Sequence, residues 1–279
     1  MKIAVLSGKG GTGKTLVSVN LACSAKKAVY ADCDVEEPNG QLFLKPIITN
    51  KTSVTVTIPS VDLNKCTRCR KCITFCKYNA LALINDKLMI FNEVCHSCGG
   101  CIVLCPQKAF METSRIIGSI EEGISGNVLA VSGCLNTGEV SGVPIIKSIM
   151  SKLPKEEIVI IDCPPGSACV VMESIRSADF CVLVAEPTIF GTHNLAMVYD
   201  LVKFFNKPAG VLLNKCVDGQ ENPSEEFCIN NKINILAKIP FDEQLGSLNS
   251  QGFISVREDN KYKELFENLL TNIEKEILQ

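Results

Sequence analysis

Eight cysteines in two identically spaced runs constrain this chain more than any other feature of its sequence. Each run reads CxxCxxCxxxC, and the second run repeats the first at a distance of 29 residues. The runs are Cys66, Cys69, Cys72 and Cys76, followed by Cys95, Cys98, Cys101 and Cys105. The repeat extends to Ile73/Ile102 and Ala80/Ala109, so it predicts a small module built from two copies of one unit.

This spacing is the ligand pattern of proteins that hold two [4Fe-4S] clusters, in which the fourth cysteine of each run ligates the other cluster. It predicts one cluster on Cys66, Cys69, Cys72 and Cys105, and a second cluster on Cys95, Cys98, Cys101 and Cys76. Structural zinc and disulfides are the alternatives. Zinc sites rarely come as eight cysteines in a tandem repeat, and disulfides are rare in a reducing cytoplasm. His96, inside the second run, is expected beside the cluster and not as a ligand.

A phosphate-binding loop follows the first apolar segment. Residues 2–7 (KIAVLS) are expected to form a short strand that runs directly into residues 8–15 (GKGGTGKT), which match GxxxxGK[ST]. The backbone amides of Gly8, Gly10, Gly11, Thr12 and Gly13 can surround a phosphate, Lys14 can reach its β/γ oxygens, and Thr15 can offer a hydroxyl to Mg²⁺. A helix expected from Leu16 to about Lys26 points its positive end at the anion. The chain is therefore predicted to bind ATP or ADP with Mg²⁺.

The segment KGGTGKT, which begins at Lys9, resembles the deviant Walker A motif of the MinD/Mrp superfamily. This resemblance implies an α/β fold with a doubly wound, mostly parallel sheet. It also implies slow, partner-stimulated ATP hydrolysis and homodimerisation on ATP binding. In that superfamily the signature lysine, here Lys9, reaches the nucleotide of the partner subunit, so Lys9 and Lys14 are both expected to act in catalysis.

Two apolar segments that end in aspartate resemble further motifs of the superfamily. Residues 28–34 (AVYADCD) are expected to form a buried strand and resemble the switch I segment, and residues 158–162 (IVIID) resemble Walker B, followed by a switch II loop. A further core strand is expected at residues 180–185 (FCVLVA). The resemblance implies that Asp34 orients or activates the attacking water, with Asp32 in support, and that Asp162 holds Mg²⁺ through water.

Two weaker matches concern the adenine base. Asn214 follows an apolar strand at residues 210–213, and Pro240 lies in the sequence IPFD. Both positions resemble adenine-contacting positions of the superfamily. His193 lies in a segment that resembles the region after switch II, but a structural role is the more ordinary expectation for it.

The cysteine runs interrupt the ATPase motifs. Residues 1–57 and 114–279 are predicted to form the ATPase, and residues 58–113 a small α+β ferredoxin-like insert. This order resembles MinD-superfamily ATPases that carry an inserted ferredoxin domain. Because the insert leaves the sheet near the switch I segment, cluster position is expected to respond to the bound nucleotide.

Charge and hydropathy limit the range of partners. Net charge is −2, and no apolar run approaches the roughly 18 residues of a membrane span, so neither nucleic acid nor a membrane is expected as a partner. The absence of a signal peptide favours the cytoplasm. Residues 60–113 nevertheless carry seven Lys/Arg against four Asp/Glu. This excess either compensates the charge of the clusters or forms a docking patch for an acidic redox partner.

Two functions remain open. The first is an ATP-gated electron carrier that serves a redox partner protein. The second is an Mrp-type ATPase that assembles iron–sulfur clusters and delivers them to an accepting protein; such carriers typically use a CxxC in the C-terminal half, which this sequence lacks. The offsets of Cys134 and Cys169 from Asp162 resemble those of cluster ligands in the nitrogenase iron protein. A third cluster shared by two subunits is therefore a further possibility, and the alternative is that both cysteines are ordinary core residues.

Overall fold

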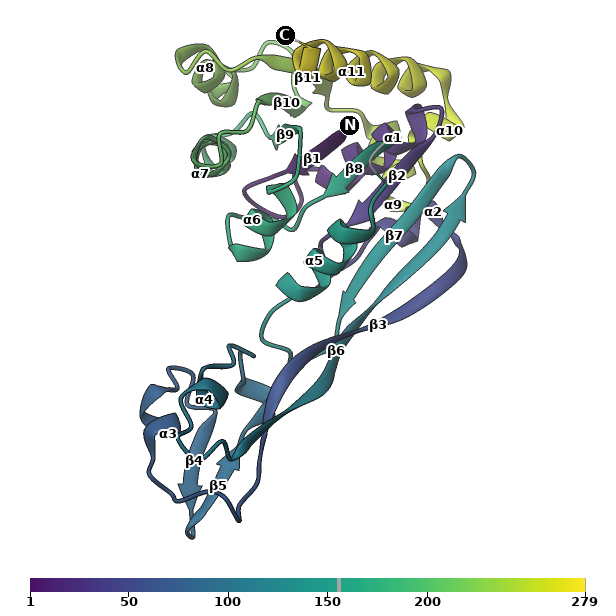
Figure 1. Cartoon of the computed structure of the whole chain (residues 1–279). Helices are drawn as coiled ribbons and strands as arrows, with labels where there is room; N and C mark the ends of the chain where they lie inside the picture. The colour runs from purple at the N-terminus through teal and green to yellow at the C-terminus, as the bar shows by residue number, and fades with distance from the viewer. Residues whose placement is uncertain (155–156, 279) are drawn as a thin grey trace.

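A nine-stranded sheet carries the fold (Figure 1). The structure is a computed structural model and describes residues 1–154 and 157–278; Gln279, the end of the predicted C-terminal ATPase segment, lies outside these residues. The strands of this sheet are β1 (Lys2–Leu6), β2 (Ala28–Asp32), β3 (Ile47–Val61), β6 (Phe110–Ser125), β7 (Val128–Leu135), β8 (Ile158–Asp162), β9 (Phe180–Ala185), β10 (Ala209–Cys216) and β11 (Ile235–Pro240). A separate two-stranded sheet consists of β4 (Leu81–Ile84) and β5 (Lys87–Ile90).

Helices connect the strands. They are α1 (Lys14–Ser24), α2 (Gly40–Leu44), α3 (Lys71–Phe75), the short 3₁₀-helix η1 (Asn92–Val94), α4 (Gly100–Val103), α5 (Val143–Lys152), α6 (Cys169–Ile175), α7 (Ile189–Phe204), α8 (Pro223–Asn230), α9 (Glu243–Ser250), α10 (Ser255–Glu258) and α11 (Asn260–Leu278). In the part of the chain that the structure describes, no helix is both long and apolar enough to cross a membrane.

The strand order is β11-β10-β9-β1-β8-β2-β7-β6-β3. The first seven of these strands are parallel, and β6 and β3 close one edge antiparallel. The prediction of a mostly parallel α/β sheet is therefore confirmed. Near-continuous apolar runs such as IVIID in β8 suit strands that are covered on both faces.

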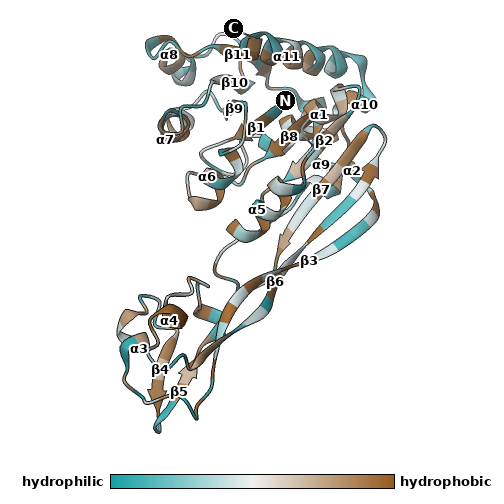
Figure 2. Ribbon diagram, in the orientation of Figure 1, coloured by the Kyte–Doolittle hydropathy of each residue, from teal (hydrophilic) through white to brown (hydrophobic). Residues whose placement is uncertain are grey.

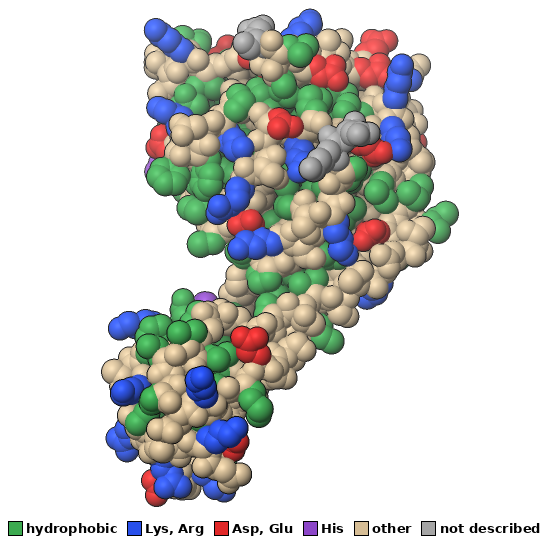
Figure 3. Space-filling model, in the orientation of Figure 1, with side chains coloured by type: hydrophobic (Ala, Val, Ile, Leu, Met, Phe, Trp, Pro, Cys, Tyr) green, Lys and Arg blue, Asp and Glu red, His purple; other side chains and the backbone are tan. Residues whose placement is uncertain are grey.

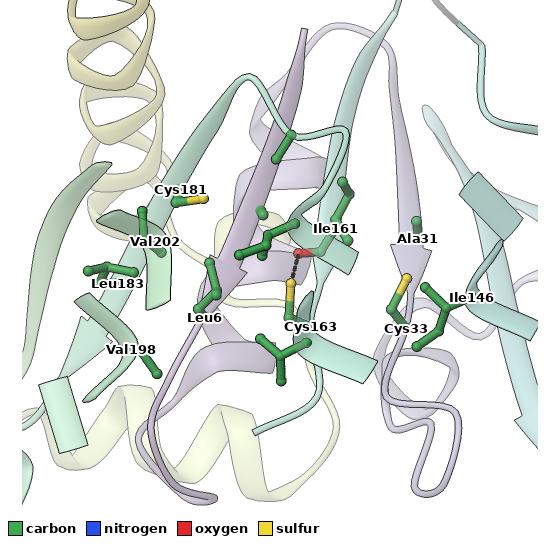
Figure 4. Packing of buried hydrophobic residues seen from close by; sticks show 14 of the residues in the cluster. Leu6, Ala31, Cys33, Ile146, Ile161, Cys163, Cys181, Leu183, Val198 and Val202 are labelled. Carbon is green, nitrogen blue, oxygen red and sulfur yellow. Dashed lines mark hydrogen bonds between the residues drawn. The ribbon is translucent and has the colours of Figure 1, made fainter. Parts of the chain in front are cut away.

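Successive strand residues enter two hydrophobic cores, one on each face of the sheet. In β1, Ala4 and Leu6 pack with α5, α6 and α7, whereas Ile3 and Val5 pack with α1, α10 and α11. Figure 4 shows part of the first core, which also contains Cys33, Cys163 and Cys181. These buried thiols pack as small apolar residues.

The C-terminal helix α11 packs against the second face of the sheet. Its buried residues are Tyr262, Phe266, Leu269, Leu270 and Ile273, and Figure 2 shows hydrophobic and hydrophilic residues alternating along it. An amphipathic helix that buries its apolar stripe in this way is part of the core.

A long antiparallel ribbon extends from the sheet edge to a separate lobe (Figure 1). It is formed by β3 and β6, which stay paired from Ile47 and Ile124 to Val61 and Phe110, with two register shifts. We call residues 62–109, which lie between these strands, the cysteine lobe. The predicted insert boundaries at residues 58 and 113 both fall inside the paired ribbon.

The cysteine lobe has a small core of its own. Leu81, Leu88, Cys101 and Phe110 are buried together, and four further cysteines, Cys66, Cys72, Cys76 and Cys105, pack against them. Thiols therefore make up much of the interior of the lobe.

Candidate functional site

The phosphate-binding loop lies between β1 and α1, as the sequence predicted. Helix α1 begins at Lys14, two residues before the expected start, because Gly13 adopts a left-handed backbone with φ of 95° and ends the loop there. A Cβ atom on Gly13 would lie 2.3 Å from the Asn214 amide nitrogen, so glycine is required at this position. The Thr12 hydroxyl is buried without a hydrogen-bond partner among the described residues.

An open pocket of about 420 Å³ lies above this loop. It is lined by loop residues Lys9, Gly10, Gly11, Gly13, Lys14 and Thr15, and across from them by Asp34, Glu37, Asn39 and Pro165. Most of the predicted phosphate-binding residues, together with Thr15 and Asp34, thus surround one space, whereas Gly8, Thr12 and Asp162 do not line it. Strand β2 ends at Asp32, so Asp34 lies in the loop beyond it and not in the strand as predicted.

The buried Lys14 ammonium is paired with Asp162. Its Nζ lies 2.9 Å from Asp162 Oδ1 and 3.8 Å from Asp34 Oδ2. Burial alone would lower the pKa of Lys14, but the Asp162 carboxylate holds this pKa above its usual value. Lys14 is therefore a permanent cation, and it bridges two of the three aspartates that the sequence singled out, Asp34 and Asp162.

The carboxyl groups of Asp32 and Asp34, which lie near Lys14, both have raised pKa values. Burial and the nearby Asp162 carboxylate raise the pKa of Asp32 well above its usual value, although a hydrogen bond from the Gly40 amide opposes the shift. Burial raises the pKa of Asp34 to about 6 although Lys14 opposes the shift. Asp34 is ionised at neutral pH and can accept a proton or a hydrogen bond from water, as a residue that orients the attacking water must.

Tyr30 is a site residue that sequence reasoning missed. Its hydroxyl is buried at the centre of the sheet and donates a hydrogen bond of 2.8 Å to Asp162 Oδ2. Burial raises the pKa of Tyr30 well above its usual value, so the hydroxyl remains a donor. Lys14 and Tyr30 together hold the two oxygens of Asp162. The only sequence signal was a tyrosine inside an otherwise aliphatic strand.

Replacing Tyr30 with phenylalanine is expected to release one oxygen of Asp162. The loss of this buried hydrogen bond should lower the free energy of unfolding by about 1–3 kcal/mol. It should also raise the Mg²⁺ concentration needed for half-maximal ATP hydrolysis by about tenfold, as loss of a group that orients a metal-holding residue does. Tyr262→Phe is the matched control, because Tyr262 also donates to a carboxylate, that of Asp242, and neither residue lines the pocket above the loop. An unchanged Mg²⁺ requirement in Tyr30→Phe would refute this role.

Lys9 makes its contacts within its own subunit. Its Nζ lies 2.5 Å from Glu186 Oε2 and 5.3 Å from the centre of the Phe190 ring. Glu186 also accepts from Lys215 at 2.7 Å. Burial tends to raise the pKa of Glu186, but hydrogen bonds from Lys215 and Lys9 hold it below its usual value. Within one subunit, the Lys9 ammonium is therefore paired with the ionised Glu186 carboxylate.

Asn214 and Pro240 do not line the pocket above the loop. Asn214 is buried, and its amide donates to the Thr12 carbonyl at 2.7 Å and accepts from the Lys215 backbone at 3.0 Å. It thus supports the phosphate loop. Pro240 is exposed at the end of β11. Adenine contacts from both residues remain predictions. His193 is exposed on α7, whose N-terminus is capped by Thr188 instead.

The internal repeat recurs in the backbone of the cysteine lobe. Left-handed residues occur at Arg68, Arg70 and Asn79, and again 29 residues later at Ser97, Gly99 and Lys108. Helices α3 and α4 occupy equivalent places in the two copies. The two cysteine runs therefore adopt one loop geometry twice.

Two pockets divide the eight cysteines between them. The first, of about 20 Å³, is lined by Cys66, Cys69, Cys72 and Cys105. The second, of about 250 Å³, is lined by Cys76, Cys95, Cys98 and Cys101. Each pocket takes three cysteines from one run and the last cysteine of the other, which is the division that the spacing predicted. Among residues 1–154 and 157–278, no three His, Cys, Asp or Glu side chains converge closely enough to hold a single metal ion.

Cys134 and Cys169 are both exposed, the first near the end of β7 and the second at the start of α6. Among the described residues no disulfide joins them. A cluster shared between subunits through these thiols stays an open prediction.

The sheet order, the phosphate loop and the acids at the ends of β2 and β8 define a P-loop nucleotide-binding protein. The chain belongs to the CobQ/CobB/MinD/ParA nucleotide-binding domain family, whose model matches residues 3–256. The MinD and ParA members are ATPases, so hydrolysis is the activity of the family.

Three known proteins illustrate the relationship. An uncharacterised protein of Methanocaldococcus jannaschii is 32% identical over 96% of both chains. Hydrogenase-4 component A of Escherichia coli is 27% identical over 165 residues, 56% of this chain and 76% of its own. Among solved structures, the septum site-determining protein MinD of Pyrococcus horikoshii, complexed with Mg-ADP, superposes with a TM-score of 0.61 at 19% identity, over 98% of this chain and 96% of that one.

Proposed function

We propose that this protein is an ATP-hydrolysing iron–sulfur protein in which nucleotide-dependent dimerisation gates electron transfer through two [4Fe-4S] clusters to a partner protein. The observation that carries this proposal is the division of eight cysteines between two pockets in the crossed arrangement of two-cluster proteins. The similarity to a component of a hydrogenase, a redox enzyme, agrees with it. The domain division at residues 58 and 113 is part of the proposal.

The cysteine lobe fits clusters better than zinc. Four thiolates around one zinc ion lie about 3.8 Å apart, whereas the thiols of this lobe line the walls of pockets and do not converge on one point. The narrower first pocket is bordered by residues 67–70, which are all exposed and thus free to adjust. Cys66, Cys69, Cys72 and Cys105 would hold one cluster, and Cys76, Cys95, Cys98 and Cys101 the other. Each cluster, when bound, supplies a site that accepts or releases a single electron.

Residues around the phosphate loop would perform hydrolysis. With a phosphate bound, Lys14 would pair with the anion in place of Asp162. Asp162 and the Thr15 hydroxyl would then be the residues that hold Mg²⁺, which would neutralise charge on the phosphates. Asp34, ionised at neutral pH, faces the same pocket and would orient the attacking water. Lys9 would leave Glu186 and reach the nucleotide of a second subunit.

Contacts between the two parts of the chain support coupling. Val35, the residue that follows the switch I segment, accepts a hydrogen bond of 2.8 Å at its carbonyl from the amide of Leu135 at the end of β7. Farther along, Arg115 on the ribbon pairs with Glu139 at 3.0 Å. A pocket of about 200 Å³ beside this pair is lined by Cys95, His96 and Ser97 of the lobe and by Ser141 and Pro144 of the ATPase. A shift in switch I can therefore reach the lobe through packed contacts.

Cluster delivery is the second candidate. Cys69 and Cys98 are exposed, and an acceptor protein could reach thiols in that position. This candidate differs from electron transfer in one measurable respect, since iron would leave the protein.

Lys9→Ala tests the gating step. Wild-type protein is expected to shift from monomer to dimer on gel filtration when MgATP is added, and the EPR spectrum of the reduced protein should change with it. Lys9→Ala should still bind MgATP but remain monomeric with an unchanged spectrum, because its cation cannot reach the second nucleotide. Lys215→Ala is the control, since Lys215 shares Glu186 with Lys9. ATP-dependent dimers of Lys9→Ala would contradict the proposal.

A further inference from the structure

We propose that the first cysteine loop, residues 65–77, is a docking surface for an acidic protein that carries one electron. This inference rests on the proposed function and names the chemistry of the partner. Docking would bring the reduced carrier next to Cys69. The carrier gives up one electron, the centre held by Cys66, Cys69, Cys72 and Cys105 gains it, and no proton or atom moves.

The two halves of the internal repeat differ sharply in charge. The first cysteine loop contains Lys65, Arg68, Arg70, Lys71 and Lys77 and no acidic residue. At the equivalent positions 29 residues later, the second cysteine loop, residues 94–106, has Val94, Ser97, Gly99, Gly100 and Pro106, and it contains no Lys, Arg, Asp or Glu. Two clusters of one kind have the same charge. Of these five cations, Arg68 and Arg70 line the first pocket and Lys77 lines the second. The first cluster would thus have more cations around it than the second, and compensation of equal charges does not account for that excess.

The basic side chains of the first cysteine loop are available to a partner. All five are exposed. Among the described residues only Lys65 forms an ion pair, with Asp62 at 3.4 Å. Arg68 and Arg70 border the pocket of the first four cysteines, and the exposed Cys69 lies between them in sequence. Unpaired guanidinium groups in this position can bind carboxylates in bidentate fashion.

The orientation of the lobe also separates the two loops. The second cysteine loop borders the ATPase, since His96 and Ser97 share a pocket with Glu139, Ser141 and Pro144. The pocket of the first four cysteines is lined by lobe residues and Phe110 only. Figure 3 shows Lys and Arg side chains gathered on the lobe, which lies apart from the ATPase. A partner can therefore approach the first loop without meeting the ATPase.

Complementary charge favours a protein over other anions, because the basic residues surround a thiol of an electron-carrying centre. Rim charges of this kind mainly raise the rate of association and make it depend on salt. A nucleic acid or an anionic membrane would use the same cations without needing the thiol, and these two occupants are outcomes of the test.

The test measures association by surface plasmon resonance with iron-loaded protein. The probes are an acidic plant-type [2Fe-2S] ferredoxin and an acidic flavodoxin. Arg68→Glu/Arg70→Glu/Lys71→Glu should associate at least about tenfold more slowly than wild type at low salt. This difference should vanish near 1 M salt, where screening extends over only about 3 Å. The control Lys26→Glu/Lys232→Glu/Lys263→Glu makes the same charge change at exposed ATPase positions and should associate like wild type.

Iron content, measured on the same samples, distinguishes failure of the docking proposal from failure of the proposed function. If irons are present but neither carrier binds, the docking proposal is wrong and the proposed clusters are still supported. The same holds if association slows as much in the control variant as in the loop variant. If wild-type protein binds anionic vesicles or single-stranded DNA more tightly than both carriers, the named partner is also wrong. If wild type holds no iron, the proposed function fails and docking with it. Should the loop variant lose iron, Arg68→Asn/Arg70→Asn replaces it, since asparagine tolerates the left-handed backbone of both residues.

Discussion

Replacing Cys105 by alanine is expected to have the same effect as replacing Cys72, although the two residues belong to different runs of the sequence. Both thiols line the first pocket. Either substitution should lower the iron content from about eight to about four atoms per chain, because one cluster of four irons is lost. The EPR signal that remains should be the same in both variants. Iron analysis by mass spectrometry and EPR of the reduced proteins measure these effects.

Cys101→Ala is the informative comparison for this experiment. Cys101 is four residues before Cys105 but lines the second pocket. Cys101→Ala should therefore lose the EPR signal of the second cluster and keep that of the first. A Cys105→Ala spectrum that matches Cys101→Ala and differs from Cys72→Ala would contradict the crossed arrangement. Cys134→Ala, an exposed thiol outside the lobe, should keep all irons.

Replacing Lys14 by alanine is expected to abolish nucleotide binding and to leave the clusters intact. Wild-type protein should gain about 2.7 kcal/mol of stability at a MgATP concentration 100 times the dissociation constant, and the variant should gain none. The nucleotide-free variant should itself be less stable by about 3–5 kcal/mol, because removing one partner leaves the buried Asp162 carboxylate without its cation. Chemical denaturation with and without MgATP measures both effects.

Lys9→Ala is the matched control for Lys14→Ala. Lys9 lines the same pocket but is partly exposed and paired with Glu186, so its variant should retain stabilisation by MgATP. Iron content should be unchanged in both variants, since the cysteine lobe packs on its own core. Loss of iron together with nucleotide binding in Lys14→Ala would contradict the modular organisation.

The sequence predicted the parts of the fold whose signals are local. The phosphate loop joins a strand to a helix within fifteen residues, and the strands β8 and β9 begin and end where the apolar runs do. The ribbon was missed. Its alternating segment TSVTVTI, residues 52–58, is typical of a strand, but it pairs with residues 113–120, which lie 55 to 68 positions further along the chain, beyond both cysteine runs. Such long-range pairing has no local motif.

In the candidate site, too, the features with a local sequence signal could be predicted and the long-range contacts could not. Spacing alone predicted which cysteines share a pocket, because the repeat fixes one loop geometry twice. The role of Tyr30 could not be predicted, since its hydroxyl meets Asp162 only after β2 and β8 pair in register. The contacts of Glu186 with Lys9 and Lys215 likewise form only where the phosphate loop meets the ends of β9 and β10.

Anaerobic iron and sulfide analysis, combined with EPR of dithionite-reduced protein before and after MgATP, tests whether ATP binding is coupled to two resident clusters. The expected result is about eight irons and eight sulfides per chain, which remain bound in the presence of an apo-ferredoxin acceptor while the EPR signal responds to MgATP. Stoichiometric zinc in place of iron, or a spectrum that MgATP leaves unchanged, would contradict the proposed function. Irons that move to the acceptor on addition of MgATP would identify a cluster-delivery ATPase instead.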